Sequence, residues 1–282
     1  LCFGLAWHKA QDALWACAFA ERSRTACKVE ALAAFSREWT ACGGVAAQAA
    51  TGSHHGPALA AAMLDAYIQQ ILPALAEWEL VGSERQFSVP LSADVTYVGW
   101  WDKVLRHKAT GRIRIRDHKT CGKSAYAVDW PNVQEWWRRE FELDWQVDGY
   151  AFAGLAEFGE AFELVEIEAS ITHPNAGNGK HDVHRVFPFP RLPEQSGAWA
   201  RDVLEVLALW GQGLRPKTGR KNSCFKYARP CVYAGFCHAG IDPARAPEGF
   251  VVQFWEPEKA RGEGGTGGAG GVAGAEGTKS TP

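Results

Sequence analysis

The feature that most constrains the fold of this chain is a predicted β-hairpin between Tyr97 and Thr120. Residues 108–111 (KATG) have the composition of a turn, and the residues on either side alternate in polarity as strands do. We therefore expect strands at Val95–Val104 and Gly111–His118, adjacent and antiparallel. The first of these strands carries an acidic residue, Asp102.

The second strand of the hairpin ends in charged residues. Ile113 and Ile115 share a face with Asp117 and Lys119, because side chains alternate along a strand with a period of two. A buried apolar face does not normally continue with charges, since burying an unpaired charge is costly. A divalent metal held by Asp102 and Asp117, with Lys119 beside a reacting phosphate, would stabilise these side chains there.

Such a site suits the hydrolysis of a phosphodiester. Mg²⁺ prefers carboxylate and carbonyl oxygens, so the backbone carbonyl of His118 is a further candidate ligand. A bound metal activates water and stabilises charge on a phosphoryl oxygen, while Lys119 would orient the water or neutralise that charge. This chemistry requires no nucleophilic Ser or Cys. The competing interpretation is that Asp117 and Lys119 simply end an exposed strand.

Global properties narrow the possible functions. The chain has 282 residues, of which 46% are hydrophobic and 22% charged, as in ordinary globular proteins. A net charge of −2 gives no global nucleic-acid signature, but a local basic groove can coexist with acidic metal ligands. The absence of a Gly-rich phosphate-binding loop argues against ATP hydrolysis. Because no membrane-spanning apolar run and no secretory signal pattern are present, we expect a cytoplasmic protein.

The order of the predicted elements indicates a mixed α/β fold. Helices come first, followed by strands, a helix, a second strand hairpin and a final helix, which predicts a central mixed β-sheet flanked by helices. Residues 43–57 are small and polar and are expected to form a loop, and Pro73 is expected to kink or restart a helix continuing to about Trp78. Beside the hairpin, elements are expected at Gly4–Arg22, Lys28–Trp39, Ala58–Leu72, Arg85–Leu91, Leu143–Phe158, Phe162–Thr172, Asp182–Phe189 and Glu194–Trp210, with a loop leading into a helix over Ala125–Arg139.

The C-terminal part of the chain has two distinctive features. Cys224, Cys231 and Cys237 lie close together, and three thiolates indicate a metal or cluster that needs a fourth ligand. Two alternatives remain open, namely zinc completed by His238 and three unligated cysteines in a loop. Residues 246–282 are rich in Gly and poor in large apolar side chains, so we expect them to be disordered.

Four motifs follow one another along the chain: Gly4-x-x-x-His8, Gly99-x-x-Asp102, Asp117-His118-Lys119-Thr120 and Gln146-x-x-x-Tyr150. Together they resemble the motifs of PD-(D/E)XK nucleases of the RecB type. This group includes phage recombination exonucleases, the AddB nuclease domain and CRISPR-adaptation nucleases. The resemblance implies a restriction-endonuclease-like core, which we expect to occupy residues 1–245.

The resemblance also implies roles for individual residues. His8 corresponds to a metal ligand that acts with the two aspartates, and an imidazole beside carboxylates suits Mn²⁺ as well as Mg²⁺. Gln146 and Tyr150 correspond to a helical pair that positions the DNA strand and Lys119. Glu84 is similar to a strand glutamate of some members, and we expect it only to support the site.

Many members of this group close the nuclease domain with a four-iron four-sulfur cluster, held by three C-terminal cysteines and one N-terminal cysteine. The resemblance therefore implies an iron–sulfur cluster at Cys224, Cys231 and Cys237. Because the chain begins with Leu1 rather than Met, we expect a missing N-terminus and a fourth ligand upstream of Leu1, with Cys2 as the other candidate.

The predicted function is a Mg²⁺- or Mn²⁺-dependent deoxyribonuclease, and specifically an exonuclease acting on DNA ends or single strands. It would serve recombination, repair, phage replication or CRISPR adaptation in a bacterial, archaeal or phage-infected cell, with a recombination, helicase or CRISPR-adaptation protein as partner and no membrane association. Trp130, Trp136 and Trp137 would stack on bases, and Arg138 and Arg139 would contact phosphates, unless these residues only form core and solvated surface. The alternative function is a catalytically inactive DNA-binding or adaptor protein with a structural cluster. The intact acidic and lysine motif argues against that alternative.

Overall fold

The computed structural model describes residues 2–121, 135–142, 144–172 and 184–212, and the backbone of two short strands further along. The chain divides into two compact units, Leu1–Gln212 and Gly213–Pro282. The elements of the first unit are α1 (Cys2–Phe19), α2 (Arg24–Ala41), α3 (Gly44–Thr51), α4 (Pro57–Gln70), the 3₁₀ helix η1 (Leu72–Glu77), β1 (Trp78–Pro90), β2 (Thr96–His107), β3 (Ile113–Cys121), α5 (Glu135–Glu140), α6 (Trp145–Phe158), the 3₁₀ helix η3 (Gly159–Ala161), β4 (Phe162–Ile171), β5 (His184–Phe189) and α7 (Pro193–Gly211).

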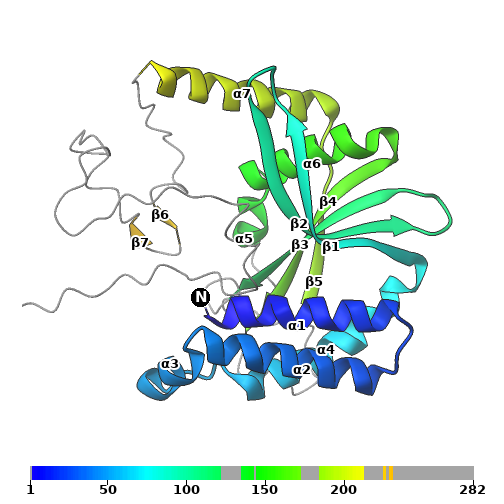
Figure 1. Ribbon diagram of the computed structural model, residues 1–282, viewed down its shortest axis with the longest axis vertical. Coiled ribbons are helices and arrows are strands. Elements are labelled where there is room, and N and C mark those ends of the chain that lie inside the picture. Colours follow the sequence, from blue (N-terminus) through cyan, green and yellow to red (C-terminus); the bar gives the residue numbers. More distant parts are fainter. Residues whose placement is uncertain are drawn as a thin grey trace, which may run out of the picture. The chain divides into compact units, whose positions relative to one another are not determined.

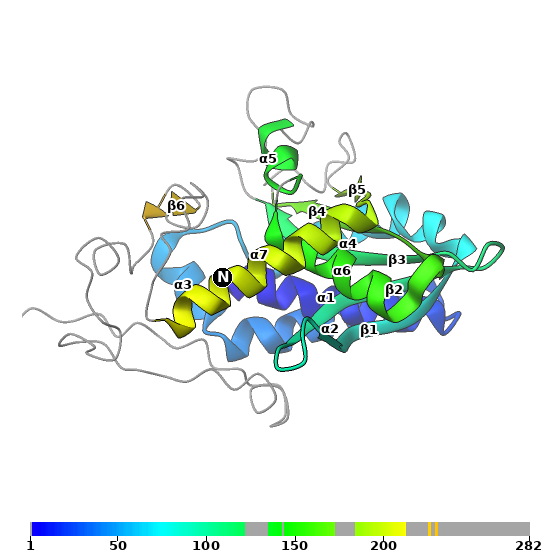
Figure 2. The same cartoon turned by 90° about the horizontal axis from the view of Figure 1, so that it is seen from above.

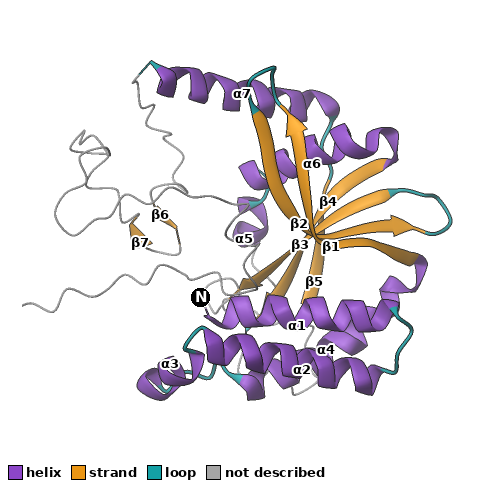
Figure 3. Cartoon of the chain, in the orientation of Figure 1, coloured by secondary structure: helices purple, strands orange, loops and turns teal. Residues whose placement is uncertain are grey.

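The centre of the first unit is a five-stranded sheet with the strand order β1-β2-β3-β4-β5. The pairs β1–β2, β2–β3 and β4–β5 are antiparallel, whereas β3 and β4 run parallel. The connection between the two parallel strands contains α5 and α6 (Figure 3). The predicted mixed sheet flanked by helices is therefore confirmed, and so is the predicted hairpin, which is formed by β2 and β3.

Helices cover both faces of this sheet. On one side α1, α2 and α4 form an apolar layer whose fully buried residues include Trp7, Trp15, Phe35 and Met63 (Figure 1). On the other side α6 packs against β3 and β4, and α7 packs along α6 (Figure 2). The sheet is thus buried on both faces, so charged residues in its central strands need partners inside the protein.

Residues 43–57 do not form the loop predicted from their composition, because α3 lies within them. This helix is rich in alanine, the best helix former, and it is flanked by Gly43 and Gly52. Both glycines adopt left-handed backbone angles, with φ of 76° and 62°, which non-glycine residues rarely take. A pair of glycines around an alanine run was the sequence signal for this helix.

Two other boundaries differ from the sequence prediction. The helix restarts near Pro73 as predicted, but the new segment is the 3₁₀ helix η1 and not an α-helix. Strand β1 begins at Trp78 instead of Arg85, so the sheet starts immediately after η1. Residues 81–84 lack the alternation of polar and apolar side chains that marks a strand, so the sequence does not predict this extension of β1.

In the second unit the structure describes β6 (Phe225–Lys226) and β7 (Arg229–Pro230), which form an antiparallel pair. Cys224, Cys231, Cys237 and residues 246–282 lie outside the described residues, as do Trp130 and the side chains of Trp136 and Trp137. The predictions for these residues, and the domain boundary at residue 245, stay predictions. Within the described part of the chain, no helix combines the length and apolar character needed to cross a membrane.

Candidate active site

The candidate site lies where β2 and β3 separate. Their antiparallel pairing ends at Lys103 and Arg116, and the next residues along the two strands are Asp102 and Asp117. Beyond this point the backbone of β3 is bonded to a side chain of β2 and not to its backbone. Asp102 Oδ2 accepts a hydrogen bond of 2.8 Å from the backbone N–H of His118. The strands therefore part at the two predicted acidic residues.

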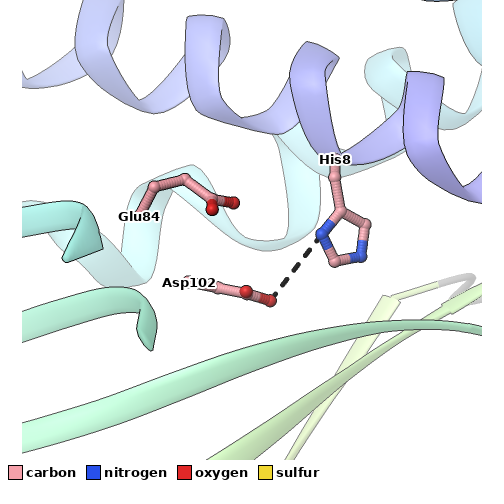
Figure 4. A group of neighbouring side chains, drawn as sticks. All are labelled: His8, Glu84 and Asp102. Atoms are coloured by element: carbon pink, nitrogen blue, oxygen red, sulfur yellow. Dashed lines mark ion pairs between the residues drawn. The ribbon is translucent and has the colours of Figure 1, made fainter. Parts of the chain in front are cut away.

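Three potential ligands meet beside this opening. His8 on α1, Glu84 on β1 and Asp102 on β2 point toward one another, and one donor atom from each lies within 4.8 Å of the others (Figure 4). His8 Nδ1 is 3.7 Å from Asp102 Oδ2, which is longer than a hydrogen bond. The three side chains come from segments far apart in the sequence and converge only in the fold.

The position of Glu84 follows from the register of β1 and β2. Ser83 pairs with Lys103 and Arg85 pairs with Trp101, so Glu84 lies opposite Asp102. Glu84 also has a positive φ of 48°, in the left-handed region that glutamate rarely adopts. The structure thus adds to the candidate ligands a residue that the sequence predicted only as a supporting group.

The chemistry of these three donors fits a divalent cation. Two ligands on opposite sides of one Mg²⁺ ion lie roughly 4 Å apart, so donors within 4.8 Å can surround a single ion. Burial lowers the pKa of His8, which favours the neutral imidazole that coordinates metals. Burial opposes ionisation of Asp102, but attraction to His8 and His118 in their protonated forms, together with the backbone N–H of His118, lowers the pKa of this carboxyl. One imidazole and two carboxylates suit Mg²⁺ or Mn²⁺.

A second group of side chains is built around Asp117. Its Oδ2 lies 2.7 Å from Lys119 Nζ, and its Oδ1 accepts a hydrogen bond of 3.3 Å from Gln146 Nε2. Lys119 Nζ in turn donates to Gln146 Oε1 at 3.0 Å. The Asp117 side chain is 3% exposed and that of Lys119 is 30% exposed, so a buried carboxylate and an amide orient the ammonium of a partly exposed side chain.

The start of α6 fixes Gln146 in this position. Asp144 caps the helix by accepting a hydrogen bond of 2.7 Å from the backbone N–H of Gln146. One turn later Tyr150 accepts from Gln146 Nε2 at 2.9 Å, and its hydroxyl donates to the carbonyl of Trp100 at 2.8 Å. The predicted Gln146–Tyr150 pair is therefore in contact with both β2 and the lysine.

Ionisation states differ sharply within the site. Burial raises the pKa of Asp117 to about 6, and nearby Asp102 adds to the increase while Lys119 opposes it. Burial also opposes the charge on Lys119, but the Asp117 carboxylate outweighs it and raises the pKa of the ammonium. Near neutral pH the lysine is charged, and Asp117 has a pKa at which a carboxylate can exchange a proton.

A buried lysine side chain, Lys103, links α1 to β2 beside the site. Lys103 is 1% exposed, and its ammonium pairs with Asp12 on α1 and donates to the backbone carbonyl of Asp102 at 3.1 Å. Asp12 follows His8 by one helical turn, so the pair sets the spacing between His8 and Asp102. No sequence signal predicts this contact, because each residue alone is an ordinary surface charge.

A family model for the PD-(D/E)XK nuclease superfamily matches residues 2–238. The chain belongs to this superfamily. The predicted PD-(D/E)XK membership and restriction-endonuclease-like fold are therefore confirmed, whereas the RecB type stays a prediction. The matched region includes the whole five-stranded sheet and every residue of the candidate site. No curated protein matches the chain.

Within this PD-(D/E)XK domain, the predicted site residues fall into two neighbouring groups. His8 and Asp102 form the first with Glu84, and Asp117, Lys119, Gln146 and Tyr150 form the second. His118 joins them through its backbone N–H, whereas a metal-binding role for its carbonyl stays a prediction. Arg138 pairs with Glu142 at 2.8 Å, and a role for Arg138 and Arg139 at phosphates also stays a prediction.

Proposed function

We propose that this nuclease-superfamily chain is a Mg²⁺- or Mn²⁺-dependent deoxyribonuclease that acts as an exonuclease on DNA ends or single strands. The observation that carries the proposal is the placement of Lys119. Its ammonium is bound to Asp117 and Gln146, and its side chain is partly exposed near the cluster of His8, Glu84 and Asp102. A phosphodiester is the substrate that uses a metal site and an oriented cation together.

His8, Glu84 and Asp102 would hold the divalent cation, and Asp117 lies beside them. When bound, the cation supplies a polarised water and neutralises charge on the phosphate. Gln146 and Asp117 hold the Lys119 ammonium in one orientation before substrate arrives, so it can donate to a phosphate oxygen without reorganisation.

Asp117 would receive the proton lost by the attacking water. Its pKa of about 6 is close to neutral, where a carboxylate is ionised yet basic enough to accept a proton. Lys119 contacts the same carboxylate and keeps it oriented as the proton arrives. The chain's own residues therefore account for orientation, charge and proton transfer at the site.

We further propose that the substrate is DNA processed in recombination, repair, phage replication or CRISPR adaptation in the cytoplasm, together with a helicase, recombination or CRISPR-adaptation protein. These assignments rest on the motifs that the chain shares with RecB-type nucleases. They can be tested by copurification from cells that express the tagged full chain.

The central experiment is cleavage of end-labelled single-stranded and duplex DNA by the purified chain with Mg²⁺, with Mn²⁺ or with EDTA. We expect metal-dependent release of short products from DNA ends, and no cleavage of closed circular DNA. Asp117→Asn and Lys119→Met should each reduce the rate by at least about 100-fold. Asp94→Asn and Lys108→Met alter exposed charges elsewhere in the sheet connections and serve as matched controls.

The outcome separates the possible functions. Cleavage of circular DNA would replace exonuclease with endonuclease activity. DNA binding without cleavage in either metal would favour the inactive adaptor. Cleavage that persists unchanged in Asp117→Asn and Lys119→Met would contradict the site assignment.

We also propose a four-iron four-sulfur cluster at Cys224, Cys231 and Cys237, supported by their spacing and by the RecB-type resemblance. Anaerobically purified protein should be brown and contain about four iron and four sulfide per chain, and Cys231→Ser should lose the colour. Colourless protein containing one zinc per chain would replace the cluster with a zinc site.

A further inference from the structure

Four cysteines of the first two helices are arranged symmetrically. Cys2 and Cys17 lie on α1, Cys27 lies on α2, and Cys42 caps its end, with fifteen residues separating the two cysteines of each helix. Fifteen residues are about four helical turns, so the two cysteines of each helix occupy the same side. Helices α1 and α2 form an antiparallel hairpin (Figure 1). The order of the cysteines along the two helices therefore places Cys2 with Cys42 at one end of the hairpin and Cys17 with Cys27 at the other.

Contacts confirm the two pairs. At one end the Cys2 thiol donates to the Cys42 carbonyl at 2.8 Å, while the Cys42 thiol donates to the Trp39 carbonyl at 3.5 Å. At the other end Cys17 and Cys27 lie in the same apolar core, and the Cys27 thiol donates to the Arg22 carbonyl at 3.8 Å. None of these four cysteines is in a disulfide in the structure.

The pairs differ in access. Cys17 and Cys27 are 3% and 1% exposed and belong to the apolar core. Cys2 and Cys42 are half-buried, and Cys2 lines a cavity of about 430 Å³ together with Phe3 and Cys121. A small reagent therefore has room to reach Cys2, whereas Cys17 and Cys27 are buried in the core.

We propose that Cys2 and Cys42 form a redox modification site that small-molecule disulfides oxidise to an intramolecular disulfide, while Cys17 and Cys27 stay reduced in the folded protein. The Cys2 thiol already contacts Cys42, so the bond would join two residues that are adjacent in the fold. The inference concerns the helical hairpin and does not depend on the proposed nuclease activity.

The reaction proceeds by two exchanges. Cys2 lines the cavity and is therefore the thiol that meets the reagent first, whereas burial and the neighbouring Cys2 thiol raise the pKa of Cys42 to about 11. Cys2 loses its proton and attacks the small disulfide, which releases one small thiol and leaves a mixed disulfide on Cys2. Cys42 then loses its proton, attacks the Cys2 sulfur and releases the second small thiol. The protein loses two protons and two electrons, and the reagent is reduced to two thiols.

The expected consequence is a restraint on α1. His8 follows Cys2 by six residues on the same helix, so a bond at Cys2 ties the segment that carries a candidate ligand to the end of α2. Because the bond closes a loop of about 40 residues, it should raise the melting temperature of the folded chain.

The test is incubation of the reduced full chain with excess oxidised glutathione, followed by alkylation, proteolysis and mass spectrometry. We expect a peptide pair joined through Cys2 and Cys42, with Cys17 and Cys27 free and alkylated only after denaturation. In Cys42→Ser, glutathione should remain attached to Cys2. Cys121→Ser changes another cysteine of the same cavity and should leave the Cys2–Cys42 bond unaffected.

Several results would overturn the proposal. They are glutathione retained on Cys2 in the unsubstituted chain, a bond between Cys2 and Cys121, and no modification of Cys2 at all. A melting temperature that does not rise on oxidation would contradict the restraint on α1. The unsubstituted chain alone decides these outcomes, so failure of a variant to fold leaves the test intact.

Discussion

Strand β3 carries a cluster of charged side chains on each of its faces. The two clusters differ in how completely neighbouring side chains compensate the buried charges. On one face Arg116 and His118 contact Glu168, which is fully buried and also accepts hydrogen bonds from Gln11 and Tyr67. On the other face Asp117 lies next to Asp102, and the pKa of Asp117 is raised. Both clusters are buried, but the pKa of the central carboxyl is lowered only in the first, at Glu168.

This difference separates a structural cluster from a binding site. Burial opposes the charge on Glu168, but His118 and Arg116 outweigh it and hold the pKa at about 2. At Asp117 the attraction to Lys119 does not offset the cost of burying the carboxylate, so ionisation is disfavoured until a further cation binds. The face that is incomplete without a ligand is the one we propose to bind metal and phosphate.

The largest expected effect comes from breaking the satisfied cluster. Glu168→Gln removes the charge that compensates buried Arg116 and should lower the free energy of unfolding by about 3–5 kcal/mol. Glu163→Gln is the matched control, because its side chain is 33% exposed and pairs with Arg114, so it should cost at most about 1 kcal/mol. Urea denaturation followed by tryptophan fluorescence measures both. Equal losses in the two variants would contradict the comparison.

The same cluster predicts sensitivity to acid. Burial lowers the pKa of neighbouring His184 from 6.5 to about 4, and that of Glu168 is lowered from 4.5 to about 2. Both folded-state values are depressed, so the stability they contribute is present above the unfolded values and is lost as pH falls. His184 should account for about 3 kcal/mol of loss between pH 6.5 and 4, and Glu168 for a further loss between 4.5 and 2.

Melting curves recorded from pH 8 to pH 3 test this dependence. His184→Gln should flatten the decline between pH 6.5 and 4, whereas His54→Gln, which changes an exposed histidine, should follow the unsubstituted chain. An unchanged slope in His184→Gln would show that another group takes up the proton.

A smaller effect is expected from the ligand that the structure adds to the incomplete cluster. Glu84→Gln should weaken Mn²⁺ binding at least about 10-fold, because one carboxylate of the proposed donor set is lost. Glu79→Gln alters a glutamate of the same strand that is 55% exposed and pairs with Arg106, so its Mn²⁺ affinity should not change. Isothermal titration calorimetry without DNA measures binding independently of cleavage. Equal affinities would remove Glu84 from the site.

The smallest expected effect has the opposite sign to that of Glu168. At pH 7 and without metal, Asp117→Asn should raise the free energy of unfolding by about 1 kcal/mol, since it removes a charge that burial disfavours. The variant should nevertheless be inactive. Destabilisation by Asp117→Asn would mean that the ion pair with Lys119 outweighs burial, and the contrast between the two faces would then fail.

The sheet and most of the site could be predicted from local sequence. The alternation that ends in Asp117 and Lys119 identifies a strand with charges on a buried face, and the four-residue spacing of Gln146 and Tyr150 places both on one side of a helix. These signals are local because each depends on the period of a single element. The structure then shows that the elements meet.

Features that depend on contacts between distant elements could not be predicted in this way. Glu84 reaches the site through the register of β1 with β2, and its strand is irregular where it lies, with a shift between Leu80 and Gly82. Glu168 has no sequence signal at all, because its partners come from α1, α4 and β3. Helix α3 was missed for a different reason, namely that small residues between glycines resemble a loop in composition.

The peptide N–H of His118 connects the two faces, since it donates to Asp102 while the ring of the same residue lies 3.0 Å from Glu168. Its proton therefore senses the charge density on the Asp102 oxygen directly. Any cation that draws on that oxygen weakens the hydrogen bond and shifts the resonance of this one amide. The chemical shift of the His118 amide, measured by NMR on histidine-labelled protein, would thus report cation binding at Asp102 without substrate or turnover.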